Sequence, residues 1–506
     1  MKRLGVWLTL LAMLIAVLPA VAAQGDVREF VVLYAKGASL DAARAAVKAA
    51  GGTIVKENAA VGVATVRTRN PNFAAAVSQQ GAVGGVARSK PIGFAPRQNR
   101  PNERDEIERL TQERASMGRQ PAPARVDASK RRGSEPLADL QWDMAMIHAT
   151  ADGSYRKQLG SNKVLVGVID TGIDGSHPDI KPNFNSSLSR NFTTDIELVD
   201  GPCAAEADQS CEDPPDVDEN GHGTHVAGTI GAALNGLGIG GIAPNVTLVN
   251  LRAGQDSGYF FLQETIDALT YAGDNGIDVV NMSYFVDPWL YNCASNAADS
   301  PEEQQEQRTI VEATQRALDY ARSHGVTLVA AAGNQATDLG YPILDAISPD
   351  FPPGAERTRT VDNSCKTMPT EGNGVISVSS IGPSQGKADY SNYGMEQTDV
   401  AAPGGYFRDF FGTPQYRVNA NLILSAYPKS VGLAAGTIDP TTGEPLTTAV
   451  VRDCKGSVCA YYQYIQGTSM ASPPAAGVAA LIVSEFGKKD KAHGGLTLAP
   501  ETVKRL

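Results

Sequence analysis

The chain reads Gly467-Thr468-Ser469-Met470-Ala471-Ser472-Pro473 and continues with an apolar run at 475–482. This pattern predicts a buried helix with Ser469 in its first turn, after a glycine, Gly467, at which the chain turns. A hydroxyl there lies beside backbone N–H groups and the positive end of the helix dipole, where a developing oxyanion is stabilised. Serine alone is a weak nucleophile, so catalysis also requires a base and a carboxylate that orients the base.

Two segments supply those groups. The β-branched run at 163–169 is typical of a strand buried on both faces, and it ends in Asp170-Thr171-Gly172. Asp170 is therefore expected at the carboxyl edge of a parallel sheet, where functional groups gather in α/β folds. Farther along, small residues surround His222 in the stretch 220–229, which predicts that His222 begins a close-packed helix.

A third segment supplies an amide. The apolar run at 326–332 predicts another buried strand, and it is followed by Gly333-Asn334. The NH₂ group of an asparagine is a suitable second donor to an oxyanion. A lone Asp, His or Ser of this kind is usually a turn, cap or packing residue, so the prediction rests on their joint occurrence.

In this order, the motifs around Asp170, His222, Asn334 and Ser469 resemble those of the subtilisin-like serine proteases, over roughly residues 137–506. The resemblance implies a three-layer α/β fold with a mostly parallel sheet, and an endopeptidase activity. It implies that Ser469 attacks the peptide carbonyl, that His222 transfers the proton and that Asp170 orients His222. Asn334 would hold the oxyanion.

The resemblance also implies a substrate cleft with Ser283 and Tyr284 on one wall and Ala331 and Gly333 on the other. Family members commonly follow the serine with Leu-Gly-Gly, whereas this chain has bulky residues at 284–286. Three hypotheses follow: a protease that digests external proteins, a maturation protease of narrow specificity that cuts leader peptides, and an inactive secreted binding protein of the same fold. The intact catalytic set argues against the third.

No cofactor is expected to be required for the chemistry. His222 and His225 are three residues apart, but no H-E-x-x-H pattern accompanies them, so His225 is expected to pack near the helix start. The loop at 234–244 resembles the family's calcium loop in shortened form, with fewer polar side chains, and the calcium site is not carried over. An acidic loop either binds structural calcium or is simply solvated. Its carboxylates are Asp208, Glu212, Asp213, Asp216, Asp218 and Glu219.

The first 22 residues are typical of a secretory signal peptide. Lys2 and Arg3 precede a mainly apolar stretch at 4–18, and Ala20-Val21-Ala22 fits a small-x-small cleavage site. A membrane anchor is the alternative, but the apolar stretch is short for a span of about 20 residues. The chain is therefore expected to be secreted and extracellular, and free of the membrane once the signal is removed.

All six cysteines lie in the part predicted to be catalytic. An even number in an exported chain predicts disulfides, and the absence of a C-x₂-C pair makes a metal site less attractive. Short loops favour the pairs Cys203–Cys211 and Cys454–Cys459, which leaves Cys293 to pair with Cys365.

Residues 28–95 show the pattern strand, helix, strand, strand, helix, strand, with the helices expected at 40–50 and 72–80. This pattern is similar to the inhibitory propeptides of subtilisin-like proteases, and an unrelated ferredoxin-like module is the alternative. A charged linker at 96–136 contains Lys130-Arg131-Arg132, and the maturation point stays open between residues 92 and 140.

Charge divides the chain unevenly. Residues 1–137 hold 21 basic and 11 acidic residues, whereas the remainder holds 23 basic and 44 acidic residues. This division argues against a nucleic-acid partner and predicts that the two parts attract each other. The expected partners are a peptide or protein substrate and the chain's own propeptide, and a monomer is expected.

Overall fold

The computed structural model describes residues 27–89, 135–205 and 209–506. The predicted signal peptide at 1–22, nearly all of the linker at 96–136, and Asp208 of the acidic loop lie outside these ranges. The described residues fold into a small N-terminal part (27–89) and a larger part that follows the gap.

A seven-stranded sheet forms the centre of the larger part. Its strand order is β13-β12-β9-β8-β5-β7-β6, and all neighbouring strands pair in parallel. Parallel neighbours need crossover connections, which place helices on both faces of the sheet and bury its middle strands. The strands are β5 (Leu165–Ile169), β6 (Arg190–Asn191), β7 (Thr247–Arg252), β8 (Val279–Met282), β9 (Thr327–Ala331), β12 (Ile376–Ile381) and β13 (Val400–Pro403).

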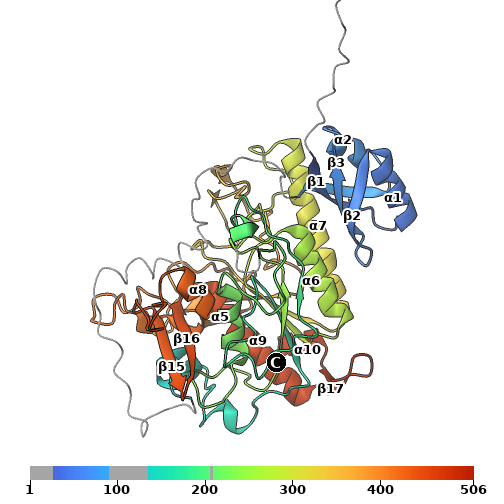
Figure 1. Cartoon of the computed structure of the whole chain (residues 1–506). Helices are drawn as coiled ribbons and strands as arrows, with labels where there is room; N and C mark the ends of the chain where they lie inside the picture. Colours follow the sequence, from blue (N-terminus) through green and yellow to red (C-terminus); the bar gives the residue numbers. More distant parts are fainter. Residues whose placement is uncertain (1–26, 90–134, 206–208) are drawn as a thin grey trace, which may run out of the picture.

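Two pairs of helices cover the two faces of this sheet (Figure 1). On one face, α5 (His222–Gly231) and α9 (Thr468–Phe486) pack in one apolar cluster with β5 side chains such as Val166. On the other, α6 (Leu262–Asp274) and α7 (Pro301–Ser323) pack with side chains such as Val280 of β8. The structure therefore confirms the predicted three-layer α/β fold.

Helix α7 begins at Pro301, within a polar stretch of the sequence that did not predict a helix. Ser300 caps this helix: its Oγ accepts a hydrogen bond from the Glu303 backbone N–H, and the Glu303 carboxylate accepts one from the Ser300 N–H. Pro301 occupies the first helical position, where its missing N–H costs nothing. The signal was local, but the polar first turns masked the helical periodicity.

A second, antiparallel sheet lies beside α5. Its order is β14-β16-β15, with the strands β14 (Ile423–Ala426), β15 (Val450–Lys455) and β16 (Val458–Ile465). The hairpin of β15 and β16 carries the Cys454–Cys459 disulfide, as predicted, and the other two predicted cystines also form. In the described ranges, no helix has both the length and the apolar character needed to cross a membrane.

Short elements complete the larger part. They are η2 (Ala138–Leu140), α4 (Trp142–Met146), η3 (Ser154–Arg156), η4 (Cys203–Ala205), β10 (Leu344–Asp345), β11 (Arg359–Thr360), η5 (Asn419–Asn421), α8 (Lys429–Ala434), β17 (Lys488–Lys489), β18 (Leu496–Thr497) and α10 (Pro500–Arg505).

The N-terminal part has the predicted order of strands and helices. Its antiparallel sheet has the strand order β2-β3-β1-β4, with α1 and α2 in the connections. The elements are β1 (Arg28–Tyr34), α1 (Leu40–Ala49), β2 (Gly52–Asn58), β3 (Val63–Thr68), α2 (Phe73–Ser78) and β4 (Val83–Arg88).

Both faces of this small sheet are apolar, and each has its own partner. Phe30 and Val32 of β1 pack in a cluster with the side chains of α1 and α2. Val31 and Leu33, which alternate with them, belong to the cluster that contains Ile310 of α7. Figure 1 shows the small sheet beside α7, so the N-terminal part uses the outer surface of the larger part to complete its core.

Polar contacts frame that interface. Lys56 lies 2.8 Å from Asp267 of α6, and Asn58 donates to the same carboxylate. Arg88 donates to the carboxylate of Glu306 from its backbone N–H and from its guanidinium, each at 2.9 Å. Basic and polar groups of the N-terminal part thus meet acidic groups of the larger part, in agreement with the attraction predicted from the charge division.

Candidate active site

Asp170 and His222 meet at the carboxyl edge of the parallel sheet. Asp170 directly follows β5 and is completely buried. Its Oδ1 accepts a hydrogen bond from the Thr171 backbone N–H at 2.8 Å and lies 2.7 Å from Nδ1 of His222. A carboxylate in this position fixes which ring nitrogen of the histidine carries the proton.

A glycine permits this close approach. His222 is the first residue of α5, and its side chain is 14% exposed. A Cβ on Gly223 would lie 2.1 Å from the Gly172 carbonyl oxygen and 3.0 Å from the Asp170 Cβ. Only glycine therefore lets the start of α5 pack against the end of β5, and this packing brings His222 to Asp170.

Asp218 organises the turn that leads into α5, and little in the sequence distinguishes it from the other carboxylates of the acidic loop. Its Oδ1 accepts from the backbone N–H groups of Asn220 and Gly221, and its Oδ2 accepts from the N–H and the hydroxyl of Thr224. Burial raises the pKa of Asp218. The only available signal was its place four residues before His222.

His225 holds the face of α5 that lies opposite Gly223 and the end of β5. Its Nε2 lies 3.2 Å from the Ile423 carbonyl oxygen and 3.1 Å from that of Gln463, in β14 and β16. His225 therefore packs near the helix start, as predicted, and connects α5 to the antiparallel sheet.

Ser469 lies at the start of α9, close to the end of β8. Its hydroxyl donates to the Ser283 carbonyl oxygen at 3.3 Å, while the Ser283 hydroxyl donates to the Ser469 carbonyl oxygen at 3.1 Å. Ser469 is 3% exposed. These reciprocal contacts join the predicted nucleophile to a predicted wall of the substrate cleft.

Thr468 sets the orientation of Asn334. The Asn334 Oδ1 accepts hydrogen bonds from the Thr468 backbone N–H and hydroxyl, both at 2.8 Å. The Thr468 hydroxyl in turn accepts from the Gly333 N–H at 3.0 Å. Because the carbonyl side of the amide is engaged with α9, the NH₂ group is left as the donor. Thr468 stands in the diagnostic stretch, but its role required the three-dimensional contact.

The residues predicted to form the cleft lie beside these groups. Ser283 and Ala331 are buried, and Tyr284 is 5% exposed. The Tyr284 ring stacks on Phe260 with ring centroids 4.1 Å apart, so it packs into the apolar cluster between the sheet and α6. Gly333 has a φ of +102°, a backbone conformation that favours glycine.

Asp213, one of the carboxylates considered for calcium, has a protein partner. The Arg252 guanidinium is buried and pairs with Asp195, Asp213 and Asp256, which form the three-carboxylate cluster found among the described residues. Next to the loop at 234–244, Asp179 accepts a hydrogen bond from the hydroxyl of Tyr462 at 2.7 Å. An internal cation and a hydroxyl therefore already engage these acidic groups.

Comparison with known proteins now identifies the family. The model of the subtilase family matches residues 161–506, about two thirds of the chain. The chain belongs to the subtilase family. It is therefore a hydrolase, a subtilisin-like serine endopeptidase, as the motifs predict.

Individual subtilases are similar at moderate identity. Subtilisin DY from Bacillus licheniformis is 28% identical over 327 residues, which cover 65% of this chain and 78% of that protein. The epidermin leader peptide-processing serine protease EpiP from Staphylococcus epidermidis is 27% identical over 371 residues, or 73% of this chain and 70% of the relative.

Solved subtilase structures share the fold. EpiP from Staphylococcus aureus superposes with a TM-score of 0.61 at 20% identity, over 95% of this chain and 99% of that one. The nisin leader peptidase NisP from Lactococcus lactis gives a TM-score of 0.51 at 24% identity, over 72% of this chain and 87% of that one. The likeness to EpiP extends N-terminal to the family match.

The buried His225 predicts a pH dependence of stability for this subtilase. Burial lowers the pKa of His225 to about 3, whereas an unfolded histidine titrates near about 6.5. Between these values the unfolded chain binds a proton that the folded chain does not. The free energy of unfolding should therefore fall as the pH is lowered from about 6.5, by at most about 1.4 kcal/mol per pH unit from this residue.

Denaturant unfolding between pH 7 and pH 4.5 measures this effect. A Ser469→Ala chain, in which self-digestion is suppressed, is compared with the same chain carrying His225→Asn. We expect a shallower pH slope without the histidine, whatever the difference in absolute stability. Parallel slopes would show that His225 does not resist protonation.

Proposed function

We propose that this chain is a secreted serine endopeptidase, made as a self-processing precursor, that hydrolyses peptide bonds of extracellular proteins. The observation that carries the proposal is the hydrogen bond between Asp170 and His222, at the sheet edge where β8 and the start of α9 bring Ser283 and Ser469 together. An aspartate, a histidine and a serine that serve only structural roles have no reason to share this edge.

In the proposed reaction, the Ser469 oxygen forms a bond to the peptide carbonyl carbon and its proton passes to Nε2 of His222. Asp170 holds the other ring nitrogen and stabilises the imidazolium that results. When the C–N bond breaks, His222 gives the proton to the leaving amine. Water then repeats the sequence on the acyl-enzyme, which releases the acid and restores the serine hydroxyl.

Asn334 and the Ser469 backbone N–H are the proposed oxyanion donors. The two hydrogen bonds from Thr468 hold the Asn334 amide before substrate arrives, so no reorganisation is needed during the reaction. Loss of one such donor typically costs about 2.7–4 kcal/mol of transition-state stabilisation.

We propose that residues 27–89 act as the intramolecular inhibitor. Support comes from the interface with α6 and α7, where one apolar face of the small sheet is buried and Arg88 pairs with Glu306. Secretion is supported by the signal-like sequence at 1–22 and by the three disulfides, which form in oxidising compartments.

A narrow maturation activity is the second candidate. It is favoured by the nearly buried Tyr284 and Phe285 beside Ser283, and by the similarity to EpiP, a leader peptide-processing protease. A cleavage profile on a peptide library separates the two candidates. One dominant cleaved sequence is expected for a maturation protease, whereas many cleaved sequences are expected for a digestive one.

Mass spectrometry of the secreted chain tests self-processing. We expect wild type to lose its N-terminal part and Ser469→Ala to remain full length apart from signal removal, because the variant lacks the nucleophile. The new N-terminus would locate the maturation site. Identical cleavage of both proteins would mean that another protease does the processing, and absence of cleavage from both would contradict the proposal.

Arg88 tests the inhibitor role. Arg88→Ala removes one side of the ion pair with Glu306, whose side chain is 3% exposed, so the docked domain should leave sooner. We expect the lag between self-cleavage and the appearance of peptidase activity to shorten by about threefold or more. Arg67→Ala is the matched control, because Arg67 pairs with Glu29 inside the same domain. Equal lags in both variants would count against the role.

A further inference from the structure

The segment that leaves β8 is unusually well buried for a connection. It begins at Ser283, whose carbonyl oxygen accepts from Ser469, and it runs to Cys293. Phe285, Trp289 and Tyr291 are at most 6% exposed. Connecting segments ordinarily lie on the surface, so the burial of three large aromatic side chains in a segment that starts at a contact with Ser469 indicates a specific role.

Phe285 links the backs of the two predicted cleft walls. It shares a buried apolar cluster with Leu290, Tyr291 and Ala332. Ala332 stands between Ala331 and Gly333, which were predicted to form the opposite wall. The cluster therefore connects the segment after β8 to the segment after β9, and a change in one wall is resisted by the other.

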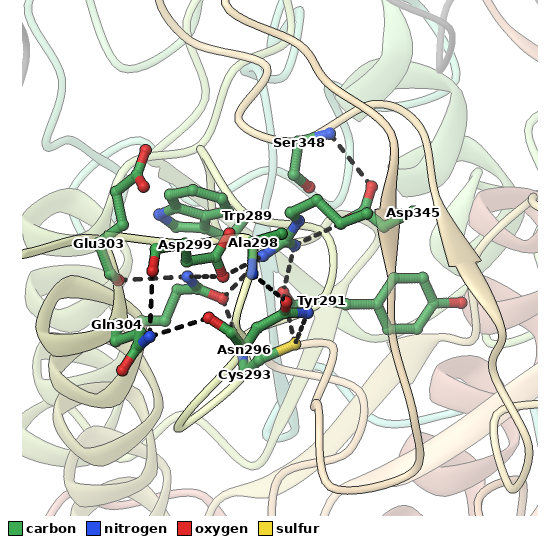
Figure 2. Close-up of polar contacts among 12 residues, drawn as sticks. Trp289, Tyr291, Cys293, Asn296, Ala298, Asp299, Glu303, Gln304, Asp345 and Ser348 are labelled. Carbon is green, nitrogen blue, oxygen red and sulfur yellow. Dashed lines mark hydrogen bonds and ion pairs between the residues drawn. The ribbon is translucent and has the colours of Figure 1, made fainter. Parts of the chain in front are cut away.

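A buried arginine holds this cluster from behind. Arg359 is 1% exposed, and its guanidinium pairs with the buried carboxylates of Asp299 at 2.7 Å and Asp345 at 2.5 Å. It also donates to the Tyr291 carbonyl oxygen at 2.8 Å, and it lies over the Trp289 ring, 4.6 Å from the centroid. Figure 2 shows four of the residues that contact this guanidinium, Trp289, Tyr291, Asp299 and Asp345.

The end of the same segment is fixed covalently. Cys293 forms a disulfide with Cys365, 72 residues farther along the chain. Beside it, Asn292 and Lys366 exchange two backbone hydrogen bonds of 2.8 and 2.9 Å. A buried charge is tolerated only where its partners are correctly placed. The ion pairs and the disulfide thus leave the segment little freedom to move outward.

We propose that Phe285 determines specificity, and that Arg359 and the Cys293–Cys365 disulfide are its positioning groups. Together they keep the cleft narrow, so that it accepts small side chains such as glycine, alanine or serine at P1, the substrate residue before the cleaved bond. The inference rests on the proposed function, because it assigns a substrate class to the same site. A rigid pocket rejects a larger side chain sterically, whereas a movable wall accommodates it.

Two peptides that differ only in alanine or phenylalanine at P1 test the inference with the processed enzyme. We expect wild type to favour alanine by about tenfold or more in kcat/KM. Phe285→Ala should lower this preference by about threefold or more, because it removes the buried ring that supports both walls from behind. Arg359→Met and the double variant Cys293→Ala/Cys365→Ala should act in the same direction.

The chain offers matched controls. Cys454→Ala/Cys459→Ala removes a disulfide at the tip of the β15–β16 hairpin, and Arg408→Ala removes an exposed ion pair with Asp389. Both should leave the alanine-to-phenylalanine ratio unchanged. Arg359→Lys, which keeps the charge, should retain more of the preference than Arg359→Met. The ratio does not depend on how much enzyme is folded, so a loss of stability alone cannot change it.

The possible outcomes are distinct. A wild-type enzyme that cleaves both peptides equally, or a ratio unchanged by Phe285→Ala, would overturn the assignment of Phe285 while the protease function stood. Ratios that fall equally in the control variants would overturn the positioning role. If wild type cleaves neither these peptides nor its own N-terminal part, the proposed function fails and this inference fails with it.

Discussion

The contact between the start of α5 and the end of β5 is the constraint on which the candidate site depends. Gly223 lies so close to Gly172 that no larger residue fits, and this packing sets the position of His222 relative to Asp170. The remaining supports act on the same helix: Asp218 orders the turn before it, and His225 ties its far side to β14 and β16. The site is thus built from backbone packing first and from side-chain hydrogen bonds second.

Much of this arrangement was predictable because its signals are local. The strands at 163–169 and 326–332, the helix after Ser469 and the order of elements in residues 28–95 all follow from hydrophobic periodicity and turn residues. Two cystine pairs followed from short spacings, and the third, Cys293–Cys365, followed by elimination. Asp170 was predictable at the carboxyl edge of the parallel sheet, and its pairing with His222 followed from the resemblance to the subtilisin-like proteases.

The features that the sequence did not predict depend on contacts between residues far apart along the chain. Arg359 and Asp299 are 60 residues apart, Arg252 and Asp195 are 57 residues apart, and no spacing rule connects such pairs. The role of Thr468 was not predictable from the sequence, since its partner Asn334 lies 134 residues away. The beginning of α7 was not predicted because its first turns are polar. Ser300 and Pro301 are nevertheless residues typical of a helix N-terminus.

The two apolar faces of the small N-terminal sheet bear on whether the release of this part would be reversible. While residues 27–89 are docked, Val31, Leu33 and Val63 are shielded by α7 and its neighbours. If this part is cut from the chain and leaves, as proposed, that face would be exposed to water and the fragment would lose part of its core. A poorly folded fragment would be readily digested by the protease. Digestion after departure would then turn a reversible dissociation into an irreversible step.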